Sequence, residues 1–98
     1  MLLAAIDRWR APAPPASRVA WLGQHDYAHR GLHGPAVPEN SLRACADAIA
    51  RGFGIECDVQ RSADGQLVVF HDWDLDRLTD AEGPVRTRSL VGLAQLDL

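Results

Sequence analysis

The sequence predicts an α/β fold, and a change in hydrophobic period is the main observation behind this prediction. Apolar residues recur at helical spacing between residues 40 and 51, and then alternate with polar residues from 53 to 59. A turn signal follows, and a continuous apolar run then covers Leu67 to Phe70. Strand, helix, strand and strand in this order are typical of a layered α/β architecture.

Composition narrows the class of protein. The chain has 98 residues, 47% of them hydrophobic and 23% charged, which is typical of one folded domain. Ten Lys and Arg residues against 13 Asp and Glu residues give a net charge of −3, and the cations are not gathered on one face. We therefore expect no nucleic-acid partner.

The amino-terminal segment is expected to be a lead-in. Its apolar opening, Met1 to Ile6, is followed by Asp7 and Arg8, so it falls well short of the roughly 18 to 20 residues of a membrane span. No basic stretch precedes it, as one would in a signal peptide. The proline-rich stretch Ala11 to Ala16 is a non-helical spacer. We assign residues 1–20 to lead-in and spacer, and residues 21–98 to the domain.

The two cysteines point to a reducing compartment. Cys45 and Cys57 match neither a disulfide framework nor a metal-binding CxxC pair. We interpret them as small buried hydrophobic residues, and expect a cytoplasmic protein.

The first predicted strand lies within Trp21 to Ala28, and the loop Gly31 to Pro38, rich in glycine and proline, follows it. A helix is expected from Asn40 or Ser41, one of which caps it, to Arg51, with Gly52 just beyond its end. Its apolar stripe consists of Leu42, Cys45, Ala46, Ile49 and Ala50.

The next strand is expected over Phe53 to Val59. Alternation places Glu56 and Asp58 on one face, and sends Ile55, Cys57 and Val59 into an apolar layer. The run Leu67 to Phe70 suits a strand buried on both faces. A polar loop (residues 74–84) and an amphipathic segment with Leu90, Leu93 and Leu96 complete the chain.

Glu56 and Asp58 are the candidate metal ligands. Two adjacent carboxylates repel each other, and a hard divalent cation with oxygen ligands relieves that repulsion. A solvent-facing polar strand edge explains the pair equally well when it is considered alone.

Two histidines lie at strand ends, where α/β folds gather their sites. His71 follows four apolar residues and precedes Asp72, and His29 lies at the end of the first strand beside Arg30. A lone histidine here is more often structural, but two together with the carboxylate pair favour a site. Arg30 then suits a phosphate contact, with a surface cation as the alternative.

Other polar residues are expected to have no catalytic part. His25 and His33 are interpreted as structural or solvated, and Asp74 and Asp76 as residues that cap or solvate a loop. Cys57 is predicted to face away from the carboxylates.

Six short motifs follow one another along the chain. They are Ala28-His29-Arg30-Gly31, Pro38-Glu39-Asn40-Ser41, Gly54 to Val59, Ser62-Ala63-Asp64-Gly65, Val69-Phe70-His71-Asp72 and Leu75 to Thr79. Each motif is weak alone, but their ordered set is highly specific. Through this set the chain resembles the glycerophosphodiester phosphodiesterases from about Tyr27 to Leu96.

The resemblance implies a TIM-type (β/α) barrel of the phospholipase-C-like phosphodiesterase kind, of which this chain holds about three strands and one to two helices. It implies hydrolysis of glycerophosphodiesters to glycerol 3-phosphate and an alcohol. His29 and His71 look like the acid/base pair, and Arg30 looks like the phosphate contact. Glu56 and Asp58 look like ligands of a divalent cation, Mg²⁺ or Ca²⁺.

In that family the substrate's own glycerol hydroxyl is thought to attack phosphorus. One histidine would remove its proton and the other would protonate the leaving oxygen. Glu39 belongs to the motif, and we assign it to holding the loop and the helix start.

The link from Val59 to Gln66 is too short for a crossover helix. A hairpin centred near Asp64 would bring His71 opposite Asp58, and the family's barrel places both at one rim.

A barrel of this type has eight strands in about 250 residues. We therefore interpret the chain as an N-terminal portion that stops before the family's third carboxylate ligand, and expect the C-terminal part of the barrel as its partner. The alternatives are a related phospholipase of the phosphoinositide phospholipase C or sphingomyelinase D type, and a non-catalytic remnant that folds with a partner chain.

Overall fold

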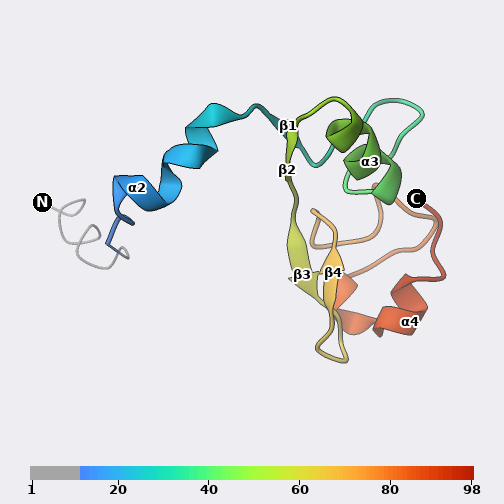
Figure 1. Ribbon diagram of the computed structural model, residues 1–98. Coiled ribbons are helices and arrows are strands. Elements are labelled where there is room, and N and C mark those ends of the chain that lie inside the picture. The colour runs from blue at the N-terminus through green and yellow to red at the C-terminus, as the bar shows by residue number, and fades with distance from the viewer. Residues whose placement is uncertain (1–11) are drawn as a thin grey trace, which may run out of the picture.

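The computed structural model describes residues 12–98, so the predicted lead-in at Met1 to Ile6 lies outside the described residues. Figure 1 shows α2 and η1 as an arm that leads into a body built around two small sheets. One 3-10 helix, η1, crosses the boundary predicted between residues 20 and 21. The elements in order are α2 (Ala16–Val19), η1 (Ala20–Gln24), β1 (Tyr27–His29), α3 (Leu42–Ala50), β2 (Gly54–Glu56), β3 (Val59–Arg61), β4 (Leu67–Val69), η2 (Val85–Thr87) and α4 (Leu90–Leu93).

The helix predicted after residue 40 is confirmed as α3. Ser41 is its N-cap, and the Ser41 hydroxyl accepts a hydrogen bond from the Ala44 backbone N–H at 3.1 Å. Gly52 follows the helix with a φ of +76°, the left-handed conformation that ends many helices. None of the helices within residues 12–98 has the length and apolar character needed to cross a bilayer.

The predicted apolar stripe of α3 is wrong. Leu42 and Ile49 are 91% and 65% exposed, whereas Ala44 and Ala48 are fully buried. The loop after β1 packs closely on this alanine face, because Gly31 has no side chain. A Cβ there would lie 2.8 Å from Ala44 Cβ.

β1, α3 and β2 form a βαβ unit, in which the two strands pair in parallel with Ala28 opposite Ile55. The predicted first strand is correct only at its end, because Trp21 to Gln24 is the 3-10 helix η1. The Trp21 indole N–H donates to the Arg18 carbonyl at 3.0 Å and so helps to close a helical turn. This local bond favours helix over strand.

The strand predicted over residues 53–59 is two strands, β2 and β3, with a break at Cys57 and Asp58. The break occurs because the chain changes partners: β2 pairs with β1, and β3 pairs antiparallel with β4. The hairpin expected near Asp64 is confirmed. The Phe70 N–H donates to the Asp58 carbonyl at 3.0 Å, so Phe70, and not His71, lies opposite Asp58.

Burial of the strand residues also differs from prediction. The run Leu67 to Phe70 is covered on one face, since Phe70 is buried while Leu67 and Val69 are 70% and 47% exposed. A two-stranded hairpin offers one face to the small core, and no described element covers the other. That core consists of Phe70, Leu75 and Val85, with Val68, Leu78, Ala81, Leu93 and Leu96 packed against it.

The cysteines are not buried as predicted. Cys57 is exposed, Cys45 is half-buried, and both thiols are free. Val59, predicted to share the apolar face of Cys57, is also exposed. The break between β2 and β3 ends the alternation on which that prediction depended.

Candidate active site

The ends of β1 and β2 bring three of the predicted site residues together. The parallel register pairs His29 with Glu56, and His29 Nε2 lies 4.0 Å from Glu56 Oε2. Both side chains are open to solvent at 70% and 49% exposure. Arg30 follows His29 directly, and its backbone N–H donates to the Glu56 carbonyl at 2.8 Å.

Arg30 leaves the strand in an unusual conformation. Its φ of +59° is left-handed, which costs a residue with a Cβ about 1 to 2 kcal/mol. Its side chain is largely buried, and Nη1 donates to Glu39 Oε1 at 2.9 Å. Nε lies 3.4 Å from Asp58 Oδ2 but makes no hydrogen bond within residues 12–98. The two carboxylate contacts hold the guanidinium beside Asp58, one of the two candidate metal ligands.

Asp58 is oriented by Asn40. The Asn40 amide donates to Asp58 Oδ2 at 3.1 Å, and the Asp58 backbone N–H donates to the Asn40 side-chain oxygen at 3.4 Å. Asn40 also has a left-handed φ of +57°, which asparagine tolerates well. The sequence suggested Asn40 only as a helix cap, so this contact was missed.

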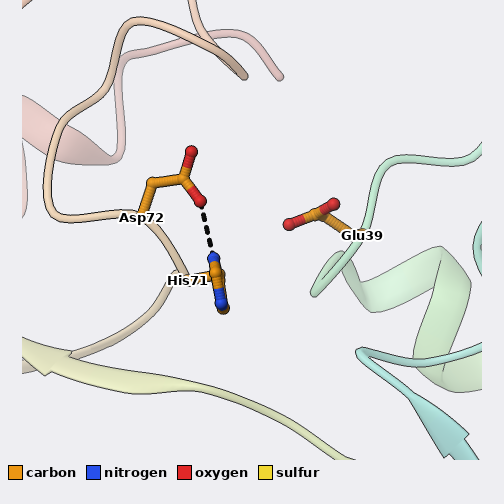
Figure 2. A group of neighbouring side chains, drawn as sticks. All are labelled: Glu39, His71 and Asp72. Atoms are coloured by element: carbon orange, nitrogen blue, oxygen red, sulfur yellow. Dashed lines mark hydrogen bonds and ion pairs between the residues drawn. The ribbon is translucent and has the colours of Figure 1, made fainter.

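His71 and Asp72 lie across from these residues, in the loop that follows β4. His71 Nδ1 lies 2.6 Å from Asp72 Oδ1, and Figure 2 shows this pair facing Glu39. Arg77 donates to both carboxylate oxygens of Asp72, from Nε at 2.7 Å and from Nη2 at 2.9 Å. The hydrogen bonds from Arg77 and His71 hold the pKa of Asp72 well below its usual value.

Glu39 joins the two sides of this region. It accepts hydrogen bonds from Arg77 Nη2 at 2.7 Å, Arg77 Nη1 at 3.1 Å and Arg30 Nη1 at 2.9 Å. These bonds, chiefly those from Arg77, lower its pKa to about 2 despite burial, which acts in the opposite direction. Of the two tasks predicted for it, Glu39 holds the loop after β1 through Arg30, whereas the helix start is capped by Ser41. Arg77, 38 residues away, carried no sequence signal that linked it to Glu39.

A cleft of about 600 Å³ contains part of the predicted site. Its lining includes Asp58 and His71 together with Asp72 and Arg77. His29, Arg30 and Glu56 are not among its lining residues. Asp76, predicted to cap, does so: its Oδ2 accepts a hydrogen bond from the Gly83 N–H at 3.0 Å.

Two sets of side chains offer donor atoms of the kind that bind a cation. Within residues 12–98, Glu39, His71 and Asp72 each offer a ligand atom, all within 4.8 Å of one another. Glu56 and Asp58 form no group of three with another acidic, His or Cys residue there. Each of the two still offers the carboxylate oxygens that Mg²⁺ and Ca²⁺ prefer as donors.

Comparison with known proteins identifies the family. The model of the "Glycerophosphoryl diester phosphodiesterase family" matches residues 29–98. A glycerophosphodiester phosphodiesterase of Caldanaerobacter subterraneus subsp. tengcongensis is 46% identical over 71 residues, which are 71% of this chain and 29% of the relative. A probable glycerophosphodiester phosphodiesterase 1 of Mycobacterium tuberculosis is 44% identical over 71 residues, covering 71% and 26% of the two chains.

Solved structures agree. Glycerophosphodiester phosphodiesterase from Agrobacterium tumefaciens matches with a TM-score of 0.69 and 42% identity, covering 74% of this chain and 32% of its own. An Oleispira antarctica phosphodiesterase, solved with the product sn-glycerol-3-phosphate, matches with a TM-score of 0.69 and 43% identity, covering 74% and 30%. The predicted partial TIM-type barrel is thus confirmed. The chain spans less than a third of the length of these relatives, and it belongs to the glycerophosphoryl diester phosphodiesterase family.

Proposed function

We propose that the full-length protein carrying this chain hydrolyses glycerophosphodiesters to glycerol 3-phosphate and an alcohol. The observation that carries the proposal is the meeting of His29, Arg30 and Glu56 at the ends of β1 and β2. Asp58, which lies beside Arg30, lines one cleft with His71. The product bound to the Oleispira antarctica relative supports the substrate class.

His29 and His71 are the proposed acid/base pair. Both imidazoles are solvent-accessible, as groups that exchange protons with a bound diester must be. His29 lies next to a carboxylate, Glu56, and His71 next to another, Asp72. One histidine takes the proton of the attacking glycerol hydroxyl, and the other gives a proton to the oxygen of the departing alcohol, which leaves a cyclic phosphate. Water then opens the cyclic phosphate to glycerol 3-phosphate, with the two histidines again moving the protons.

Arg30 is the proposed phosphate contact. Its guanidinium is held by Glu39 and lies beside Asp58 before any substrate binds. A prepositioned cation stabilises charge that develops on the phosphoryl oxygens without reorganising at the moment of reaction. Arginine suits this task because its planar fork matches two phosphate oxygens.

Glu56 and Asp58 are the proposed ligands of a divalent cation, Mg²⁺ or Ca²⁺. Both provide carboxylate oxygens, the donors that these ions prefer. When bound, such a cation would offset negative charge on the phosphoryl group. Asn40 fixes the Asp58 carboxylate through Oδ2, so this ligand is oriented in advance.

The test is an assay of the purified full-length protein with glycerophosphocholine and either Mg²⁺ or Ca²⁺. We expect His29→Ala and His71→Ala each to lower kcat by about 100-fold or more. His33→Ala is the matched control, because His33 is exposed in the loop after β1 and should leave kcat unchanged. Activity that survives both of the first two substitutions would refute the assigned roles.

Head-group panels separate the proposed reaction from its alternatives. Cleavage of a phosphoinositide or of sphingomyelin in preference to glycerophosphocholine would favour a related phospholipase. For residues 1–98 alone we expect little or no turnover, with the C-terminal part of the barrel as the partner that completes the site. A cytoplasmic location remains the expectation, and fractionation of the source cells would test it.

A further inference from the structure

We propose that Asp72, Arg77 and Glu39 form a positioning network that orients His71 and couples it to Arg30. The inference rests on the proposed function, since it assigns a task to residues around the proposed acid/base pair. None of the three needs to touch the reacting atoms. Their task is to fix two groups that do.

The first step is the orientation of His71. Asp72 is held ionised by Arg77, so its carboxylate only accepts hydrogen bonds. At 2.6 Å from Asp72 Oδ1, His71 Nδ1 must therefore carry the hydrogen. Nε2 is then the nitrogen that faces proton exchange with substrate, accepting a proton when the ring is neutral.

The second step is the clamp that Arg77 applies. Its guanidinium donates to both oxygens of Asp72 and to both oxygens of Glu39. Such paired contacts fix the plane of each carboxylate as well as its position. Arg77 thereby ties the His71 loop to the motif before α3, although 38 residues separate Arg77 from Glu39.

The third step is the link to Arg30. Glu39 Oε1 accepts from Arg30 Nη1 at 2.9 Å and from Arg77 Nη2 at 2.7 Å. Glu39 is only 10% exposed and Arg30 17%, so water competes weakly for this contact. A shift of Arg77 would therefore change the position of Arg30, the proposed phosphate contact, as well as that of His71.

The same geometry argues against a cation bound by Glu39, His71 and Asp72, although their ligand atoms lie within 4.8 Å. Arg77 already lies between the two carboxylates, with hydrogen bonds of 2.7 Å to each. Arg30 adds a second positive charge at Glu39. A divalent ion at this place would have to displace one arginine and repel the other.

Kinetics of the full-length protein on glycerophosphocholine test the network. Asp72→Ala and Arg77→Gln should each lower kcat by about 10- to 100-fold, the usual range for groups that orient a catalytic side chain, with KM changed less than kcat. Arg77→Lys should recover only part of the loss, because an ammonium cannot contact both carboxylates in paired fashion. Arg43→Gln, which removes the exposed Arg43–Asp47 pair on α3, is the matched control and should leave kcat unchanged.

A double substitution tests the coupling. If Arg77 acts through Asp72, the loss of kcat in the double variant should be clearly smaller than the product of the two single losses. Multiplicative losses would mean independent effects and would overturn the proposed order of action.

Imidazole ¹⁵N NMR of the full-length protein at mildly alkaline pH gives a readout that needs no turnover. We expect the Nδ1–H tautomer of His71 in the unsubstituted protein and a mixture of tautomers in Asp72→Ala. An unchanged tautomer would overturn the network even if the enzyme is active. If the protein fails to hydrolyse diesters while the tautomer shifts as expected, the proposed function fails and the positioning geometry stands.

Discussion

Two regions of this molecule are held together in different ways. We call the contacts around Arg30, Glu39 and Asp58 the polar edge, and the core around Phe70, Leu75 and Val85 with its neighbours the apolar side. At the polar edge, Glu39 alone receives three hydrogen bonds from two arginines, and Asp58 is fixed by Asn40. On the apolar side the core around β4 and η2 has three buried residues, Phe70, Leu75 and Val85. Large apolar side chains beside it, Leu67 and Val91, are 70% and 69% exposed.

The difference teaches where the geometry of the candidate site comes from. Residues within this chain supply its orienting contacts. Glu39 contacts Arg30, Arg30 and Asn40 contact Asp58, and Asp72 contacts His71. Among residues 12–98, Leu67 and Val91 on the apolar side are covered less completely than Glu39 and Arg30 at the polar edge. The contacts that orient the candidate site residues are therefore present within this chain, while much of its hydrophobic surface has no described neighbour.

The largest expected effect on stability comes from a substitution in the core of the apolar side. Leu75→Ala removes a side chain that is 2% exposed and packed with Phe70 and Val85. We expect the free energy of unfolding of this chain to fall by about 2 to 5 kcal/mol, measured by urea titration.

Leu67→Ala is the matched control, because Leu67 is 70% exposed on the neighbouring strand β4. Its cost should stay within about 0.5 kcal/mol. Equal losses for Leu75→Ala and Leu67→Ala would contradict the position of the core.

The next effect concerns the polar edge and depends on pH. The pKa of Glu39 is lowered from 4.5 to about 2, so its ionised form stabilises the folded state. That contribution is fully present above about pH 4.5 and is lost as pH falls through about pH 2. It amounts to at most about 3 kcal/mol, since the half-exposed Arg77 is screened by water.

Glu39→Gln isolates this contribution. The substituted chain should be less stable than the original at pH 6, and the difference should shrink towards zero as the pH approaches about 2. Urea titrations of both chains at several pH values provide the measurement. A stability difference that is constant with pH would show that the charge of Glu39 has no part in it.

Much of the fold could be predicted from local sequence. The N-cap at Ser41 and the left-handed Gly52 mark α3, and the turn near Asp64 marks the hairpin, because these signals act over a few residues. The break after β2 could not be predicted. It depends on β3 pairing with β4 instead of with β1, which is a choice made between distant segments.

The sequence suggested which residues could form the candidate site, but not the contacts that join them. His71 and Asp72 adjoin in sequence, so their contact had a local signal that could have been used. The bridge from Glu39 to Arg77 had none, because it depends on how the loop after β4 packs against the motif before α3. Burial of Ala44 in place of Leu42 likewise depends on the close approach of Gly31.

A smaller effect tests the helix that supports the polar edge. Ser41→Ala removes the side-chain acceptor for the Ala44 N–H at the start of α3. The expected cost is about 1 kcal/mol of unfolding free energy. Ser41→Asp should retain most of the stability, because aspartate also caps helices, and circular dichroism melts of the two variants would show the difference. Equal melting temperatures for both variants would exclude a capping role.

The smallest effect is expected for an ion pair of the same chemistry outside the site. Arg43 and Asp47 lie one turn apart on α3 at 2.9 Å, but the Arg43 side chain is 73% exposed, whereas Glu39 at the polar edge is 10% exposed. Water and salt screen such a pair, so Arg43→Gln should cost no more than about 0.5 kcal/mol, and less as salt is added. Urea titrations at low and high salt measure both quantities. If Arg43→Gln lowered the free energy of unfolding as much as Glu39→Gln does, burial of the side chains would not determine the strength of the ion pairs at the polar edge.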